Sequence, residues 1–193
     1  MKRIVATFAG ILLAGLFSLR ASAHEIVYES TLSGANESPA SGSLATGFAR
    51  VTIDLDVLTM HVESNFAGLG GTTLAAHIHC CLVPGGPANV SVATAVPSFP
   101  NFPLGVQSGT YDQTFDLTQA ATWNPAFVTA NTDVAGAMNA FLNGMANGQT
   151  YFNIHTSTFQ GGEIRGFFHV VPEPQSLALL LLGVGALLAR RRA

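Results

Sequence analysis

The sequence predicts an all-β fold, an antiparallel Greek-key or immunoglobulin-like β-sandwich or barrel with one short helix. Apolar and polar residues alternate with a period of two in several short segments, and turns rich in glycine or proline separate these segments. Only one segment has a helical period. Because about 150 residues lie between the two hydrophobic ends of the chain, we expect one domain with a sizeable core.

The strands are expected where the alternation recurs, at residues 25–32, 48–56, 58–66, 73–79, 90–95, 108–117, 150–156 and 163–170. In the second of these, Val51 and Ile53 alternate with polar residues. The short link at residues 56–57 predicts a hairpin between the second and third strands. Residues 80–109 are rich in proline and glycine, which predicts a long loop with one short strand inside it.

The one expected helix covers residues 133–146, where apolar side chains recur along a single stripe. The stripe consists of Val134, Met138, Phe141, Leu142 and Met145. Asp133 or Thr132 can cap the first turn of this helix, and Gly148 can end it. We expect the stripe to pack against the core.

Residues 1–23 have the three parts of an export signal peptide. Two basic residues precede an apolar run, and an A-x-A cleavage pattern ends at Ala23. We expect this segment to be removed, with an uncleaved anchor as the alternative. Cleavage would make His24 the first residue of the mature chain.

Residues 171–193 show a second three-part pattern. The Pro172-Glu173-Pro174 motif precedes an apolar stretch at residues 176–189, and arginines follow that stretch. As a helix the stretch would be about 21 Å long, short of the ~30 Å membrane core. The pattern resembles the PEP-CTERM sorting signals of Gram-negative bacteria. That resemblance implies a short transmembrane helix and processing by an exosortase-type enzyme, with an ordinary C-terminal anchor as the alternative.

The two ends together predict export through the inner membrane, a transient membrane anchor, and final delivery to the envelope, the cell surface or the exterior. Residues 24–170 form the body between these ends. The body contains two arginines, no lysine and ten acidic residues. Its negative charge repels phosphate backbones, so we expect no nucleic acid as a partner, and cations are favoured.

Cys80 and Cys81 are adjacent in the sequence. An exported location permits disulfides, but neighbouring cysteines can pair only through a strained ring. Free thiols or an intermolecular bridge are therefore the simpler expectation. A disulfide between the two neighbours and ligation of a soft metal are the alternatives.

A polar face is predicted where three strands have the same phase. If Ile78, Ile154 and Ile164 face the core, their neighbours share the opposite face of the sheet. These neighbours are His77, His79, Asn153, His155, Glu163 and Arg165. Three imidazoles suit copper or zinc, so this face is a candidate metal site, with the three histidines as ligands. Glu163 can serve as a fourth ligand or hold a histidine in one tautomer.

The same face allows other interpretations. Glu163 and Arg165 can form a charged pair, with Asn153 and the histidines bonded to loop backbone, which would fix strand register without a ligand. A mature N-terminal His24 can also bind copper through its amine and ring. The His-Ile-His segment resembles the copper strand of Cu/Zn superoxide dismutases over three residues only, and that family's bridging histidine and zinc aspartate have no clear equivalent here. Two further histidines are expected to be solvated, His61 and His169.

Several sequence motifs resemble the CHRD domain, a module first described in chordin and widespread in bacterial secreted proteins. They are LSGANE at residues 32–37, AAHIH at 75–79, GQTYFNIHT at 148–156 and GGEIRG at 161–166. The resemblance covers roughly residues 26–170 and implies a β-sandwich. It implies no established reaction.

The function expected from these observations is non-enzymatic. The sequence has no Ser-His-Asp order and no phosphate-binding glycine loop, so it does not predict an enzyme. We expect a binding, adhesion or matrix-associated role with an extracellular polysaccharide or protein partner. The alternative is a periplasmic or extracellular copper- or zinc-binding protein that uses the His-Ile-His strand and His155.

Overall fold

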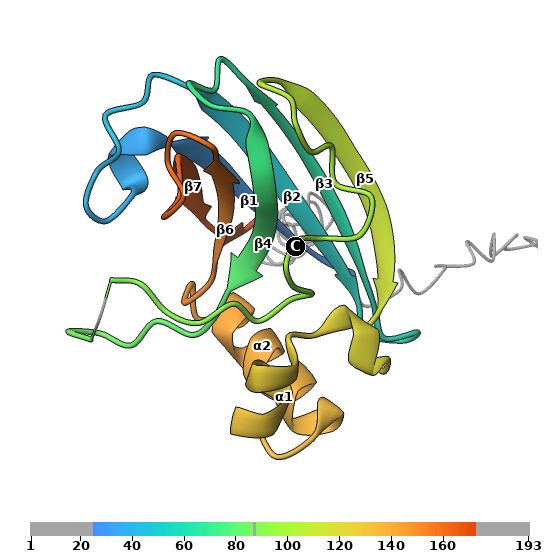
Figure 1. Cartoon of the computed structure of the whole chain (residues 1–193). Coiled ribbons are helices and arrows are strands. Elements are labelled where there is room, and N and C mark those ends of the chain that lie inside the picture. The colour runs from blue at the N-terminus through green and yellow to red at the C-terminus, as the bar shows by residue number, and fades with distance from the viewer. Residues whose placement is uncertain (1–24, 87, 173–193) are drawn as a thin grey trace, which may run out of the picture.

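The computed structural model describes residues 25–86 and 88–172. These residues form one antiparallel sheet that curves into a half-barrel (Figure 1). Its strands are β1 (Glu25–Ser33), β2 (Thr46–Asp54), β3 (Thr59–Ala67), β4 (Thr73–His79), β5 (Gly109–Asp116), β6 (Tyr151–Thr156), β7 (Ile164–Phe167) and β8 (His169–Val170). The all-β antiparallel fold expected from the sequence is confirmed.

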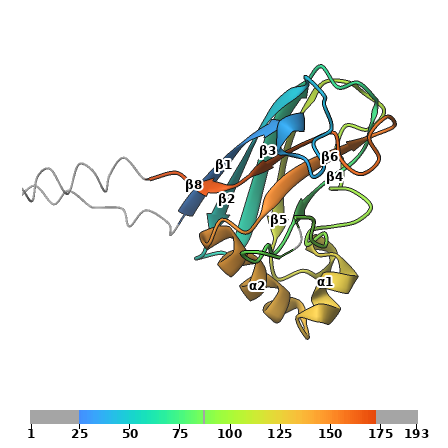
Figure 2. The same cartoon turned by 90° about the vertical axis from the view of Figure 1, so that its left-hand side faces the viewer.

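The strand order in the sheet is β4-β6-β7-β1-β2-β3-β5, with β8 beside β1. Two α-helices, α1 (Pro125–Ala130) and α2 (Val134–Ala146), lie together at one end of the half-barrel (Figures 1 and 2). Two short 3-10 helices, η1 (Gly34–Asn36) and η2 (Ala120–Thr122), complete the described elements. This order places β4 directly beside β6, although some 70 residues separate them in the sequence.

The core lies inside the half-barrel. Ile78, Ile154 and Ile164 have no exposed surface and belong to the central apolar cluster. The inward phase that the sequence predicted for these three residues is therefore confirmed. Trp123 and Phe141 close the helical end of this core, with ring centroids 5.3 Å apart.

The free edge of β4 is covered by residues 91–107 rather than by another strand. The amide of Ile78 donates to Oγ1 of Thr94, and the carbonyl of Ile78 accepts from the amide of Ala93, both at 2.9 Å. Only isolated bridges form in this segment. The strand expected at residues 90–95 is thus absent, because a side-chain hydroxyl takes the place of a ladder bond.

Most other elements agree with the sequence prediction. The β2–β3 hairpin forms with Asp54 opposite Thr59, and Asp133 caps α2 by accepting from the amide of Gly136 at 2.7 Å. The strand expected at residues 163–170 is interrupted at Phe168, whose side chain is fully buried. Helix α1 was not predicted, since six residues are too few for a readable helical period.

Cys80 and Cys81 form a disulfide with each other, so the expectation of free or intermolecular thiols was wrong. The bridge packs against α2 at Gly144. A Cβ atom at position 144 would lie 2.5 Å from Sγ of Cys80 and 2.8 Å from Sγ of Cys81. Glycine at this position therefore allows the helix to approach the bridge.

Within the described residues, no helix is both long enough and apolar enough to span a membrane. The predicted signal peptide, His24 and the sorting segment from Glu173 onward lie outside the described residues. Pro172, the first residue of the sorting motif, follows β8 directly after Val171.

Candidate metal centre

The predicted polar face lies on the side of β4, β6 and β7 that points away from the core. His77 of β4 is paired with Asn153 of β6, and Asn153 is paired in turn with Arg165 of β7. His79 and His155 each lie two residues along their strands from this row. Because side chains alternate along a strand, these five residues share one face of the sheet.

The three imidazoles are in mutual contact. The ring centroids of His77 and His155 are 4.7 Å apart, and those of His77 and His79 are 4.8 Å apart. One ring nitrogen from each histidine lies within 4.8 Å of the others. The sequence prediction that these residues meet is therefore correct.

Backbone carbonyls orient two of the rings. Nδ1 of His79 lies 2.6 Å from the carbonyl oxygen of Val90, and Nδ1 of His155 lies 2.8 Å from that of Gln160. Since a carbonyl oxygen only accepts, each Nδ1 carries the proton and each Nε2 keeps its lone pair. Both Nε2 atoms are buried and have no hydrogen-bond partner. This is the arrangement by which proteins orient histidine ligands toward a metal.

His77 completes the set from the centre of the face. It is 6% exposed, and its Nδ1 atom is also buried without a partner. An unpaired buried polar atom costs about 1–3 kcal/mol. Three such atoms in neighbouring side chains represent a substantial cost unless a ligand binds them.

Burial keeps the histidines neutral. It lowers the pKa of His77 to about 3, with smaller contributions from His79 and His155. Burial likewise lowers the pKa of His79 to about 4, against the opposing hydrogen bond to Val90. The pKa of His155 is also lowered by burial. At neutral pH all three rings therefore present lone pairs, which is the form that metals bind.

Glu163 does not join the histidines, contrary to the sequence expectation. It lies in the bend before β7, where Gly162 has a φ of +127°, so strand alternation does not extend to it. Its carboxylate accepts hydrogen bonds from the hydroxyls of Thr156 and Ser43 and from the amides of Gly70 and Gly71. Glu163 thus fastens two loops to the end of β6.

Arg165 forms its ion pair with Glu37 rather than with Glu163. Nε of Arg165 lies 3.5 Å from Oε2 of Glu37, and both side chains are almost completely buried. The guanidinium also donates to the carbonyl of Asn36, to the carbonyl of Ala88 and to Oδ1 of Asn89. These contacts hold two loops over the polar face.

Glu37 was missed as a site residue by the sequence analysis, although it ends the LSGANE motif. Burial raises its pKa to about 7, even though the Arg165 charge and a hydrogen bond from Asn153 both act to lower it. Its only sequence signal was the motif itself, because no periodicity connects an η1 loop residue to β6 and β7.

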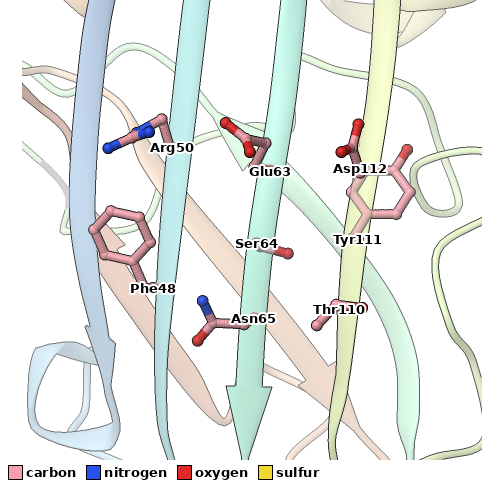
Figure 3. Close-up of a pocket in the computed structure, with 8 residues that line it drawn as sticks. All are labelled: Phe48, Arg50, Glu63, Ser64, Asn65, Thr110, Tyr111 and Asp112. Atoms are coloured by element: carbon pink, nitrogen blue, oxygen red, sulfur yellow. The ribbon is translucent and has the colours of Figure 1, made fainter.

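A second group of possible ligands lies on the outer face of β3 and β5. His61, Glu63 and Asp112 have ligand atoms within 4.8 Å of one another. Glu63 and Asp112 border a surface hollow of about 380 Å³, in which the side chains of Arg50, Glu63 and Asp112 lie in a row across β2, β3 and β5 (Figure 3). Nε2 of His61 already pairs with Asp112 at 2.8 Å, and the Asp112 side chain is 77% exposed. Water can satisfy this group, so it is the weaker candidate.

Comparison with known proteins supports the class that the fold and motifs indicate, an all-β domain of the CHRD type. The family model of the CHRD domain matches residues 28–168 of this chain. The chain therefore belongs to the CHRD domain family. No curated protein and no solved structure gives a significant match.

Proposed function

We propose that this protein is an exported CHRD-domain protein that binds one copper or zinc ion through His77, His79 and His155. One observation carries the proposal. The Nδ1 atoms of His79 and His155 are fixed by backbone carbonyls, their Nε2 atoms are buried and unpaired, and both rings lie beside that of His77.

The donor set favours these two metals. Imidazole nitrogen is a good ligand for zinc and copper and a poor one for calcium or magnesium. A tetrahedral ion with zinc–nitrogen distances of about 2.1 Å holds its ligand atoms about 3.4 Å from one another. The histidine ligand atoms lie within 4.8 Å of one another, so the rings must turn toward the ion when it binds.

The proposed role is binding rather than hydrolysis. Hydrolytic zinc sites place a general base beside the metal-bound water. Among the described residues, no carboxylate belongs to the group of three histidine ligand atoms. Glu163 is fully engaged by the loops that it fastens.

The ends of the sequence support a proposal about delivery. The signal-peptide pattern supports export, and the Pro-Glu-Pro, apolar and arginine-rich pattern supports a transient membrane anchor that an exosortase-type enzyme removes. The protein would then act in the envelope, on the cell surface or outside the cell.

Metal analysis of the purified protein tests the proposal. After exposure to copper or zinc and removal of free metal, we expect about one ion per chain and a higher melting temperature, because a ligand of the native state stabilises it. Changing His77 and His79 to alanine should abolish both effects. The matched control is His61→Ala, which leaves the three-histidine group intact.

Sub-stoichiometric metal and an unchanged melting temperature would contradict the proposal. The polar face would then be a structural network. In that case the remaining candidate role is the adhesion or matrix association expected from the sequence, with a polysaccharide or protein partner.

A further inference from the structure

A fourth unpaired atom lies on the same face as the histidines. Oδ1 of Asn153 is buried without a hydrogen-bond partner, and the residue is 2% exposed. Within the described residues, the buried side-chain atoms that lack partners are Ser30 Oγ, Ser64 Oγ, His77 Nδ1, His79 Nε2, Asn153 Oδ1 and His155 Nε2. The two serines lie at inward positions of β1 and β3. All the others share the polar face.

Asn153 has the position of a ligand. It is the direct cross-strand partner of His77, and such partners have Cβ atoms about 4.5–5.5 Å apart. It also lies two residues before His155, on the same face of β6. Asn153 therefore has a histidine beside it across the strand pair and another along the strand.

The amide of Asn153 is held by a carboxylate. Its Nδ2 atom donates to Oε1 of Glu37 at 2.9 Å, and Glu37 is paired with Arg165 of β7. This bond engages the amide nitrogen and leaves Oδ1 as the free donor atom of the side chain. The Asn153 and Glu37 pair thus resembles the support that metal ligands receive from a second residue.

Gly162 makes room for this pair. A Cβ atom at position 162 would lie 2.7 Å from both Oδ1 of Asn153 and Oε1 of Glu37. The β6–β7 turn can therefore pass over the amide and carboxylate only with glycine there.

We infer that Oδ1 of Asn153 is the fourth ligand of the metal, which completes a site of three nitrogens and one oxygen. This inference rests on the proposed function. Four ligands of this kind suit a tetrahedral divalent ion such as zinc, whereas Cu(I) prefers softer donors. The site is thereby assigned to a divalent metal, and the oxygen of Asn153 contributes to the preference for a divalent ion over Cu(I).

The test compares zinc binding by the purified protein and its Asn153→Leu variant, which keeps the side-chain volume and removes the oxygen. We expect zinc affinity to fall about 10- to 100-fold. In the protein loaded with Co(II), the visible absorption bands should change in intensity, because they report coordination number. Asn153→Asp keeps an oxygen donor at the same position and should retain binding. If the leucine variant does not fold, Asn153→Ala removes the same oxygen with less bulk.

Ser64→Ala is the matched control, because it removes another buried unpaired oxygen from the same sheet at an inward position. It should leave zinc affinity and the Co(II) spectrum unchanged. Wild-type affinity and an unchanged Co(II) spectrum in Asn153→Leu would overturn the inference while leaving a three-histidine site intact. If the wild-type protein binds neither zinc nor Co(II), both the inference about Asn153 and the proposal of a divalent-metal site are wrong.

Discussion

His79 and Tyr151 lie opposite each other on β4 and β6, with ring centroids 4.5 Å apart and ring planes only 8° from parallel. The guanidinium carbon of Arg165 lies 4.8 Å from the centre of the same Tyr151 ring. The His79 ring is thus held by a stacked aromatic side chain and by the carbonyl of Val90. Such preorganisation lowers the conformational cost of binding a metal.

We expect the metal ligands to destabilise the metal-free protein. His77→Phe keeps an aromatic ring but removes an unpaired buried nitrogen, so without metal the free energy of unfolding should stay the same or rise by about 1 kcal/mol. Metal binding should be lost. Urea unfolding in the presence of a chelator, followed by metal analysis, checks both outcomes. A loss above about 2 kcal/mol without metal would show that His77 is retained for stability.

The buried ion pair of Arg165 and Glu37 is expected to be essential for folding of the loops. Arg165→Met leaves the Glu37 carboxylate buried and unpaired, which should lower the free energy of unfolding by about 3–5 kcal/mol. Arg50→Met is the matched control, because Arg50 pairs with Glu29 at the surface and such pairs contribute about 0–1 kcal/mol. Equal effects of the two substitutions in urea unfolding would refute this expectation.

Glu163 should make stability depend on pH. Burial would raise its pKa, but the hydrogen bonds from Thr156, Gly70, Ser43 and Gly71 together lower it below the ordinary value of 4.5. Because the pKa of Glu163 is lower in the native protein than in the unfolded chain, this group stabilises the native protein at pH values above its pKa in the unfolded chain. The stabilisation is lost as the pH falls through the native pKa.

The Glu163→Gln variant tests that sign. At neutral pH it should unfold more easily by about 3 kcal/mol, because charge-assisted hydrogen bonds are lost. The difference from the wild type should shrink below a pH of about 4.5. Glu63→Gln, on the outer face of β3, should stay within about 0.5 kcal/mol. A difference that stays constant between pH 7 and pH 3 would be inconsistent with a depressed pKa at Glu163.

The contact between the disulfide and α2 is expected to tolerate no added methyl group. Gly144→Ala should lower the free energy of unfolding by about 1–3 kcal/mol, because its Cβ would overlap both sulfur atoms. Gly161→Ala is the control, since a Cβ there has no neighbour within 4 Å. Thermal unfolding of the two variants measures the contrast. A stable Gly144→Ala protein would mean that the helix can shift away.

The sorting motif has its own expected outcome. Replacing Pro172-Glu173-Pro174 by alanines should leave the full-length chain in the inner membrane, because the proposed exosortase-type enzyme would no longer find its motif. Fractionation and immunoblotting would show the retained, longer chain. Normal processing and release of the variant would refute sorting through this motif.

The sequence predicted those parts of the site that depend on strand periodicity. The isoleucines at 78, 154 and 164 set the phase of three strands, and a period of two is enough to place His77 and His155 on one face. The fold class followed from the same alternation. The adjacency of β4 and β6 did not follow from this alternation; the hypothesis of a shared face assumed it.

The remaining parts depend on loops, which carry no such period. Glu163 lies in a bend beside Gly162, which has a positive φ. Extending the alternation of β7 back to Glu163 therefore placed this side chain wrongly with the histidines. Glu37 reaches the site from η1, more than a hundred residues away in sequence from Asn153. The Cys80–Cys81 bridge depends on the local backbone, which composition does not determine.

The covered edge of β4 has a consequence for aggregation. An exposed strand edge can recruit the strands of other chains and start polymerisation. Thr94, Ala93 and Phe99 occupy the outward hydrogen-bonding groups of β4, so that edge offers no template to a neighbouring molecule. High local concentrations should therefore not convert this protein into fibrils by addition of strands at β4.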